Sequence, residues 1–315
     1  MEMQTPRQRQ RSVQMLRCFV MNYDWGKKGR DSVVGRLCAS NPHCQIDLEK
    51  PYAEMWIGTH DSGPSFLNQN LNNGSTTPGS SPSLRDWIAN NPNDMLGHKV
   101  VKIWGSSDLP FLLKALCGFI TLEELKKVIG NVPEIVEMVG SEVANQVLCI
   151  TKEDGEDKVR QLTEKEQLVL QFEKQYPNDV GVISAFFLNY VKLNPGEALC
   201  LGANEPHAYI SGDCIECMAT SDNGYIPPFE EFEVDRFHLP HGESTEFPAV
   251  PGPSIFVVTL GKGTISTSNG DNEIIQGDVL IAPAHTEISI TSTSELHIYR
   301  AGVNSTFLGQ LQLWV

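Results

Sequence analysis

The sequence predicts a mainly β protein with an inserted α-helical module. Three observations support this prediction. Residues 15–116 hold short apolar segments broken by glycine, proline and asparagine, and residues 117–181 carry two helix-start signals. From 182 to 315, strand-like segments alternate with Gly and Asn turns, a pattern that is typical of a compact β-sandwich or barrel.

The N-terminal part of the chain is expected to form strands. LRCFVMNYDWG and YAEMWIG have the composition of strands that run into turns. The polar stretch 68–83 is rich in Asn, Gly, Ser and Pro, and predicts a surface loop. The segment SLRDWIANNPNDMLG predicts a short helix that ends at Pro92, because proline cannot continue a helix.

Two helices in the middle of the chain are marked by capping boxes. Thr121 is followed by Glu124, and Thr163 by Glu166. At this spacing the two side chains cap each other's backbone N–H groups at a helix start. We therefore expect residues 117–181 to be a helical domain.

The C-terminal half returns to strand-like sequence. ISAFFLNYVKL is expected to be a strand that runs into the turn Asn194-Pro195-Gly196. After Pro228, SIFVVTLGKGTIST, NEIIQGDVLIAPAHTEISIT and ELHIYRAG predict further strands, with a hairpin turn at Gly261. NPGEALCLGANEPH and IQGDVLIAPAH share one order of turn, strand and Pro near His, which is a hint of two related β-barrels.

Composition and charge narrow the class of protein. A net charge of −15 argues against a nucleic acid or an anionic membrane surface as the main partner. No segment approaches the ~20 apolar residues that span a bilayer. Eight scattered cysteines without a scaffold spacing predict free thiols in a reducing, cytoplasmic compartment. Residues 1–15 are Arg- and Gln-rich; we expect a disordered extension, and a transit peptide is the alternative.

The segment GANEPHAYISGDCIECMATSDN (202–223) holds the leading site candidate. His207 follows a turn and a proline, and a neutral imidazole on a stiff turn is a good metal ligand or acid–base group. Alternation along a strand would place Glu205, His207 and Tyr209 on one face. A core histidine bonded to a carbonyl is the equal alternative.

Lys114 is a single cation inside the apolar strand DLPFLLKAL. Its ammonium group is costly there unless it reaches water or an anion. One interpretation is a phosphate partner. The other is an edge position from which the amine extends into solvent.

The remaining motifs are expected to be structural. Cys214 and Cys217 form a CxxC without a second pair, and positions i and i+3 of a strand face opposite ways, so packing thiols are favoured. His238 and His241 flank a proline in what we interpret as a linker, where a metal pair is not favoured.

Several long segments occur together in a fixed order. They are LRCFVMNYDWGKKG, YAEMWIGTHDSGPS (52–65), LPFLLKAL (109–116), LGANEPHAYISGDCIECMATSDN (201–223) and IPPFEEFEVDRFHLP (226–240). This set resembles type I mannose-6-phosphate isomerase (phosphomannose isomerase), over about residues 16–315. The resemblance implies two cupin-type, jelly-roll-like β-barrels with a helical domain between them. The first, catalytic barrel would comprise 16–116 plus 182–234, the helical domain 117–181, and the C-terminal barrel 235–315.

The resemblance also implies a function. The family catalyses the zinc-dependent, reversible interconversion of mannose 6-phosphate and fructose 6-phosphate, which feeds GDP-mannose synthesis. Its zinc is held by a Gln-x-His pair, a glutamate and a later histidine. A zinc ion with open positions polarises the sugar, and a base moves a proton between C1 and C2. His207 matches the later histidine, and Lys114 and Tyr209 match residues that line the substrate pocket.

The chain departs from the family at two places. After LPFLLKAL the family continues into the strand with Gln-x-His, but here Leu116 passes directly to CGFITLEELKK. After Asn223 the segment with the catalytic arginine is missing. Three of the four zinc ligands are therefore absent, and we expect His207 alone to bind zinc only weakly. The first barrel is expected to be incomplete, with open strand edges. A non-catalytic pseudoenzyme or regulatory partner of a full-length isomerase is the alternative function.

Overall fold

The computed structural model describes most of the chain. The described residues are 12–39, 45–68, 81–117, 162–175, 182, 184–202, 205, 207–219 and 231–309. The chain divides into two compact units: unit 1 comprises Met1–Gly118 and Gly212–Val315, and unit 2 comprises Phe119–Ser211. Each unit is described by itself.

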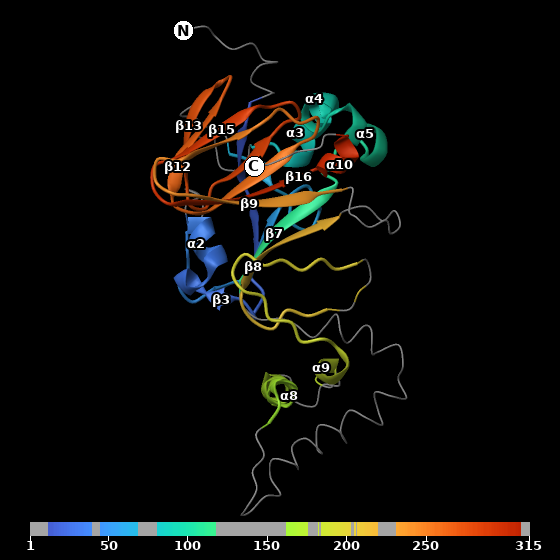
Figure 1. Cartoon of the computed structure of the whole chain (residues 1–315), viewed down its shortest axis with the longest axis vertical. Helices are drawn as coiled ribbons and strands as arrows, with labels where there is room; N and C mark the ends of the chain where they lie inside the picture. The colour runs from blue at the N-terminus through green and yellow to red at the C-terminus, as the bar shows by residue number, and fades with distance from the viewer. Residues whose placement is uncertain are drawn as a thin grey trace, which may run out of the picture. The chain divides into compact units, whose positions relative to one another are not determined.

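The largest sheet of unit 1 combines strands from both ends of the chain. In spatial order it consists of β6 (Phe66–Leu67), β1 (Gln14–Arg17), β14 (Val279–Ala282), β11 (Ser254–Leu260), β16 (Leu296–Gly302) and β9 (Glu233–Leu239). Figure 1 shows the blue N-terminal strand beside the orange strands of the C-terminal part. The extension that we predicted over residues 1–15 overlaps β1, because Gln14 and Met15 already pair with Ile281 and Leu280.

A second sheet covers one face of the first and completes a sandwich. Its order is β10 (Ser244–Phe247), β15 (Ile288–Ser292), β12 (Lys262–Thr267) and β13 (Gly270–Ile275). Phe256 and Val258 of β11 pack into the core between the two sheets, whereas Ile255 and Val257 belong to a different core on the opposite face. Both faces of β11 are therefore buried, as its continuous apolar run requires.

The third sheet carries most of the strands predicted for the N-terminal part. Its order is β2 (Phe19–Met21), β5 (Glu54–Ile57), β7 (Phe111–Cys117) and β8 (Asp213–Ala219), and a separate pair is formed by β3 (Lys27–Lys28) and β4 (Pro51–Tyr52). Met55, Ile57, Leu113 and Ala115 point into the core that also holds Ile255. One apolar core thus joins this sheet to the large one.

Short helices of unit 1 contribute to the same core. They are η1 (Gly29–Asp31), α2 (Val33–Ala39), α3 (Leu84–Asn90), α4 (Pro92–Leu96), α5 (His98–Trp104) and α10 (Ser305–Leu308). The Ser83 hydroxyl caps α3 by accepting from the Asp86 N–H at 3.0 Å, and Pro92 is the first residue of α4. The predicted helix end before Pro92 is confirmed. No described helix is both long and apolar enough to cross a membrane.

The described part of unit 2 contains helices and irregular chain. Its helices are α8 (Glu164–Gln175) and α9 (Ser184–Phe187). The predicted capping box is present at α8: Thr163 N–H donates to Glu166 Oε2 at 2.8 Å, and Glu166 N–H donates to Thr163 Oγ1 at 3.3 Å. The other box, Thr121 with Glu124, lies outside the described residues.

Three expectations from the sequence are wrong. ISAFFLNYVKL contains α9 followed by irregular chain instead of a strand, and no neighbouring strand pairs with it among the described residues. Gly261 lies in a turn between two sheets rather than in a hairpin, because β11 and β12 do not pair with each other. Cys38 is disulfide-bonded, although the cysteine spacing gave no sign of a bridge.

The mainly β character is confirmed. The described strand orders are open, so neither predicted barrel is present as a closed sheet among these strands. The cupin details and the domain boundaries remain predictions.

Candidate functional site

The third sheet of unit 1 brings Lys114 together with three other polar or aromatic residues. Lys114 lies on β7, where its Cα partners are Trp56 of β5 and Glu216 of β8. Residues directly opposite each other in a sheet share one face, and so do residues i and i+2 of one strand. Glu54, two residues before Trp56, therefore joins this row. We call these four residues the Lys114 cluster.

The Lys114 ammonium lies between two carboxylates. Its Nζ is 3.6 Å from Glu216 Oε2, 3.9 Å from Glu54 Oε2 and 4.5 Å from the ring centroid of Trp56. The indole N–H of Trp56 donates to Glu54 at 2.5 Å. The side chains of Lys114, Glu54 and Glu216 are only 13%, 12% and 15% exposed. Desolvation makes each unpaired charge here costly, so the cation and the carboxylates stabilise one another.

This arrangement decides between the two interpretations of Lys114. The strand β7 has neighbours on both sides, so Lys114 does not occupy an edge position and its amine does not extend freely into solvent. The edge position, one of the two interpretations left open for Lys114, is not observed, because β7 is an inner strand of the sheet. A phosphate would have to compete with two carboxylates for this one cation.

His207 and Tyr209 lie together in unit 2, but on irregular chain instead of the predicted strand. Their rings contact edge to face, with centroids 5.7 Å apart. The Nδ1–H of His207 donates to the backbone oxygen of Glu205 at 2.8 Å. In the neutral imidazole this leaves the Nε2 lone pair available, which is the usual arrangement of a metal-binding histidine.

A single well-oriented histidine does not make a zinc site. Structural and catalytic zinc ions take three or four protein ligands. Among the described residues, the group of three ligand side chains that does form lies in unit 1 and does not include His207. The described residues around His207 therefore do not fit a zinc ion. Asn223 lies outside the described residues.

The CxxC thiols do not supply the missing ligands. Cys217 on β8 packs against the core that holds Ile255, as predicted, and burial raises the pKa of its thiol. Cys214 is exposed, which differs from the packing role expected for it. Desolvation and the nearby charges of Glu216 and Asp213 raise the pKa of Cys214 to about 11. Both thiols stay protonated at neutral pH, and zinc binds the thiolate.

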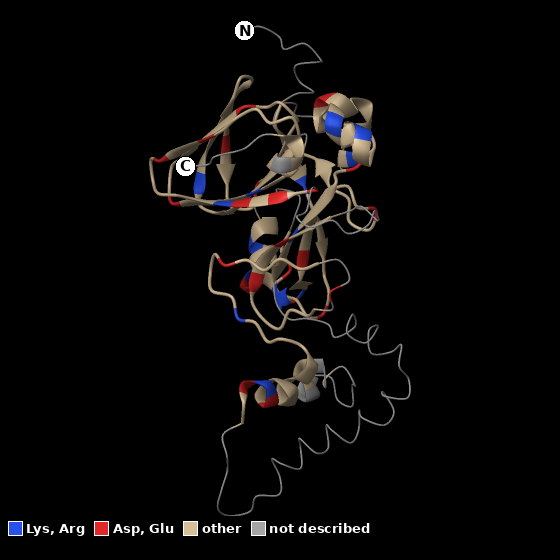
Figure 2. Ribbon diagram, turned by 45° about the vertical axis from the view of Figure 1, so that its right-hand side comes forward, with Lys and Arg blue, Asp and Glu red and all other residues tan. Residues whose placement is uncertain are grey.

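Charges of both signs are spread over the described parts of the chain (Figure 2). Reasoning from the sequence missed Glu54, Trp56 and Glu216 as neighbours of Lys114. A signal was present, since EMWI and CIEC place polar residues alternately within apolar strands. The strand register, which brings the residues into one row, could not be read from that pattern.

Comparison with known proteins places this architecture in a family. A family model described as phosphomannose isomerase type I, catalytic domain, matches residues 13–122. Mannose-6-phosphate isomerase 1 of Arabidopsis thaliana is 43% identical, over 95% of this chain and 95% of that protein. This chain belongs to the mannose-6-phosphate isomerases. Mannose-6-phosphate isomerase 2 of the same plant is 40% identical at the same coverage, and the Homo sapiens enzyme is 27% identical over 91% of this chain and 97% of its own.

Solved mannose-6-phosphate isomerases share the fold. The Salmonella typhimurium enzyme bound to fructose 6-phosphate and zinc superimposes with a TM-score of 0.64 at 20% identity, covering 92% of this chain and 99% of that one. As a mannose-6-phosphate isomerase, this chain is assigned to the aldose–ketose isomerases by family.

The length of the match bears on the two departures from the family pattern. The alignment with the 43% identical relative extends over 421 residues, whereas this chain has 315. At least 106 aligned positions of the relative therefore have no counterpart in this chain. This difference agrees with missing internal segments; their placement after Leu116 and Asn223 remains a prediction.

Proposed function

We propose that this chain has the substrate class and reaction type of its family, the reversible interconversion of mannose 6-phosphate and fructose 6-phosphate for GDP-mannose synthesis. We further propose that this form turns over much more slowly than its relatives. The observation that carries the first statement is the 43% identity over 95% of the chain. His207, Lys114 and Tyr209 are the family site residues that we assign to this chain.

The second statement rests on the site itself. His207 presents one nitrogen to a zinc ion, and it belongs to no group of three ligand side chains among the described residues. Zinc with one protein donor is held weakly and would exchange with solvent. No catalytic step through zinc follows for this chain. Of the other two residues, Tyr209 is 37% exposed, and a substrate phosphate at Lys114 would compete with Glu54 and Glu216.

A second candidate function is a non-catalytic partner of a full-length isomerase. The observation that favours it is the position of β8 at the edge of the third sheet, with no outer neighbour among the described strands. Unpaired N–H and C=O groups along such an edge are a template for pairing with another chain.

The test combines a coupled assay of fructose 6-phosphate formation with a zinc determination on the same sample. A matched chain carries the two corresponding segments of the 43% identical relative, inserted after Leu116 and after Asn223. We expect weak or no turnover in the present chain. The matched chain should contain one zinc ion more than the present chain and gain at least about 100-fold in turnover, since removing single catalytic groups commonly costs this much.

Two outcomes would contradict the proposal, and a third would favour the second candidate function. Turnover of the present chain at the rate of its relatives, lost on His207→Ala, would show that the site is complete. A matched chain that binds zinc and still isomerises no hexose 6-phosphate would overturn the assigned reaction. A present chain that does not turn over but pairs stoichiometrically with a full-length isomerase would favour the non-catalytic role.

A further inference from the structure

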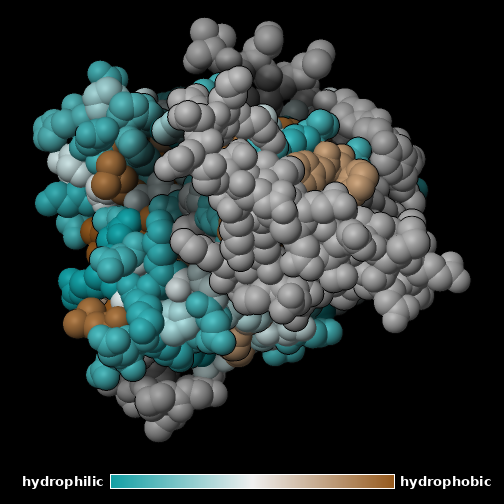
Figure 3. All heavy atoms as spheres, turned by 90° about the horizontal axis from the view of Figure 1, so that it is seen from below, coloured by the Kyte–Doolittle hydropathy of each residue, from teal (hydrophilic) through white to brown (hydrophobic). Residues whose placement is uncertain are grey.

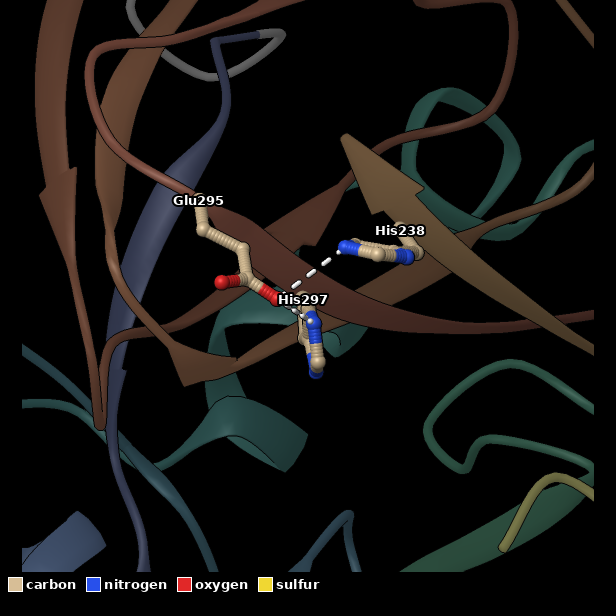
Figure 4. A group of neighbouring side chains, drawn as sticks. All are labelled: His238, Glu295 and His297. Atoms are coloured by element: carbon tan, nitrogen blue, oxygen red, sulfur yellow. Dashed lines mark hydrogen bonds and ion pairs between the residues drawn. The ribbon is translucent and has the colours of Figure 1, made fainter. Parts of the chain in front are cut away.

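Two histidines and a glutamate meet on the sandwich of unit 1, away from every residue assigned above. His238 lies on β9 and His297 on β16, and the two residues are direct Cα partners in the sheet. Glu295 lies in the bend directly before β16, two positions from His297. Figure 4 shows the three side chains converging. His238 therefore does not lie in a linker, as the FHLPH pattern suggested, and its neighbour is His297 rather than His241.

The ligand atoms are close enough to share one ion. Nε2 of His238 and Nε2 of His297 are each 3.1 Å from the same oxygen, Glu295 Oε1. The two imidazole rings lie edge to face with centroids 4.5 Å apart, and all three ligand atoms fall within 4.8 Å of one another. Tetrahedral ligands at about 2.1 Å from a metal are about 3.4 Å apart, a few tenths of an ångström more than the 3.1 Å separations from Glu295 Oε1. The separations thus match a metal-bound arrangement after small side-chain rotations.

The backbone around Glu295 is held in place before any ion binds. The N–H groups of Thr293 and Ser294 donate to the Lys262 carbonyl at 3.0 and 3.2 Å, and the Lys262 N–H donates to Ser294 Oγ at 3.0 Å. A Cβ at Gly261 would lie 1.8 Å from the Glu295 carbonyl oxygen, and Gly261 has a φ of +81°, so only glycine fits this close approach. The carboxylate and both imidazoles therefore start from fixed backbone positions, which lowers the entropy cost of binding.

The site is open to solvent on one side. The side chains of His238 and Glu295 are 53% and 59% exposed, and that of His297 is 23% exposed. An ion held by these three ligands would keep one or more positions for water or an external ligand, as in catalytic zinc sites. Two imidazoles and a carboxylate suit zinc and its neighbours Co²⁺, Ni²⁺ and Cu²⁺, and disfavour Ca²⁺ and Mg²⁺, which prefer oxygen ligands.

We propose that His238, Glu295 and His297 form a binding site for a divalent transition-metal ion, zinc foremost, on the sandwich of unit 1. Its ligands do not include His207, and the proposal does not depend on the isomerase reaction.

The test uses the full chain without a histidine tag, freed of metal by a chelator and titrated with Zn²⁺ and, separately, Co²⁺. Zinc affinity is measured against a chromogenic competitor, and the ¹⁵N resonances of the imidazoles report which histidines bind. We expect one tight equivalent that shifts the Nε2 signals of His238 and His297. His238→Gln, His297→Gln and Glu295→Gln should each weaken this equivalent by more than about 10-fold, because even outer-shell changes cost that much.

His241→Gln is the matched control, since His241 is a nearby exposed histidine outside the group, and His207→Ala tests the family position. Both should leave the tight equivalent unchanged. Circular dichroism of the metal-free variants checks that each is folded. His238 is the more exposed of the two histidines, so His238→Gln should disturb the fold least. Zinc that leaves both imidazole signals unmoved, or a tight equivalent that is lost on His207→Ala and kept on His238→Gln, would overturn the proposal.

Discussion

Lys114 and Arg300 each place one largely buried cation between two carboxylates. Arg300 on β16 is 2% exposed, and its Nη1 donates to Asp235 at 2.7 Å and to Glu233 at 3.0 Å, while its Nε donates to Ser254 at 3.1 Å. Burial raises the pKa of Asp235, and the neighbouring guanidinium opposes that rise. In such groups, the loss of one partner leaves the others charged and desolvated.

Lys114→Met should lower the free energy of unfolding by about 3 kcal/mol, because Glu54 and Glu216 would face each other without a cation. Urea denaturation followed by tryptophan fluorescence measures the effect. Adding Glu216→Gln to this variant should recover part of the loss. Lys262→Met is the control, since Lys262 is exposed on β12 and should change stability by less than about 0.5 kcal/mol. Equal effects at the two lysines would contradict the arrangement of the Lys114 cluster.

Arg300→Met should lower the free energy of unfolding by about 4 kcal/mol, more than Lys114→Met does. Arg300 is the more buried of the two cations and donates to three partners. Thermal and urea unfolding both report it. Arg236, exposed on the neighbouring strand β9, provides Arg236→Met as the matched control. A stable Arg300→Met variant would mean that Glu233 and Asp235 find other partners.

The residue scale also marks where prediction from sequence ends. The apolar strand DLPFLLKAL contains one cation, so the desolvation cost of the Lys114 ammonium group could be foreseen from the sequence. Its partners could not, because they depend on the register between three strands that are distant in the chain. The same limit applies to His238 and His297, which became neighbours only through the pairing of β9 with β16.

Elements were predicted best where the local signal and the tertiary contacts agree. The alternating segments 254–302 form strands β11 to β16, and the Thr163–Glu166 box begins α8. ISAFFLNYVKL has the same composition as a strand but no described neighbour to pair with, and it forms a short helix and irregular chain. Val191 and Leu193 are each 51% exposed there, which agrees with a segment that has no strand partner among the described residues.

On the face shown in Figure 3, the hydrophobic residues that are described stand as separate patches among hydrophilic ones.

The turn between β13 and β14 gives a pH-dependent prediction. Asp278 Oδ2 accepts from the Ile275 N–H at 2.8 Å, yet burial raises the pKa of Asp278 to about 6. The folded state therefore binds this proton more tightly than the unfolded state. The resulting stabilisation is fully present below pH ~4, the ordinary range of aspartate, and is lost as the pH rises through about 6.

Asp278→Asn should remove this pH dependence, because the amide oxygen can keep the Ile275 hydrogen bond without becoming charged. Above pH 7 we expect the variant to be more stable than the parent by about 1 kcal/mol, a value discounted for the partial exposure of the side chain. Melting temperatures between pH 4 and pH 8 measure the difference. Asp271→Asn, an exposed change on β13, should leave the pH profile of the parent unaltered. A pH profile that is the same in parent and Asp278→Asn would rule the effect out.

At the scale of the whole molecule, unit 2 is inserted between two paired strands of unit 1. The chain leaves unit 1 at Gly118 and returns at Gly212, and the flanking residues Cys117 and Asp213 are Cα partners of β7 and β8. The Nζ of Lys27, on β3, donates a hydrogen bond to Asp213 Oδ1 at 3.2 Å. The two ends of the insertion are thus already at hairpin distance.

Replacing residues 118–212 by Asn-Gly should therefore give a folded chain with one cooperative thermal transition, because two residues of this type close a tight hairpin. Calorimetry and near-ultraviolet circular dichroism measure it. The control removes Cys117 as well, which shifts the register by one residue and turns every later side chain of β8 to the wrong face. Equal stability of the two shortened chains, or collapse of both, would contradict this account of unit 1.

The pairing of Gln14 with Ile281 has a consequence for synthesis of the protein. A ribosome adds about 5–20 residues per second, so the N-terminal strand β1 waits roughly 10 to 50 seconds before β14 emerges. The last strand, β16, then inserts between β11 and β9 and completes the sheet. During that interval the side of β1 that later pairs with β14 stays open, and such an open strand edge can pair with other chains. The large sheet of unit 1 can therefore close only after β16 has been translated.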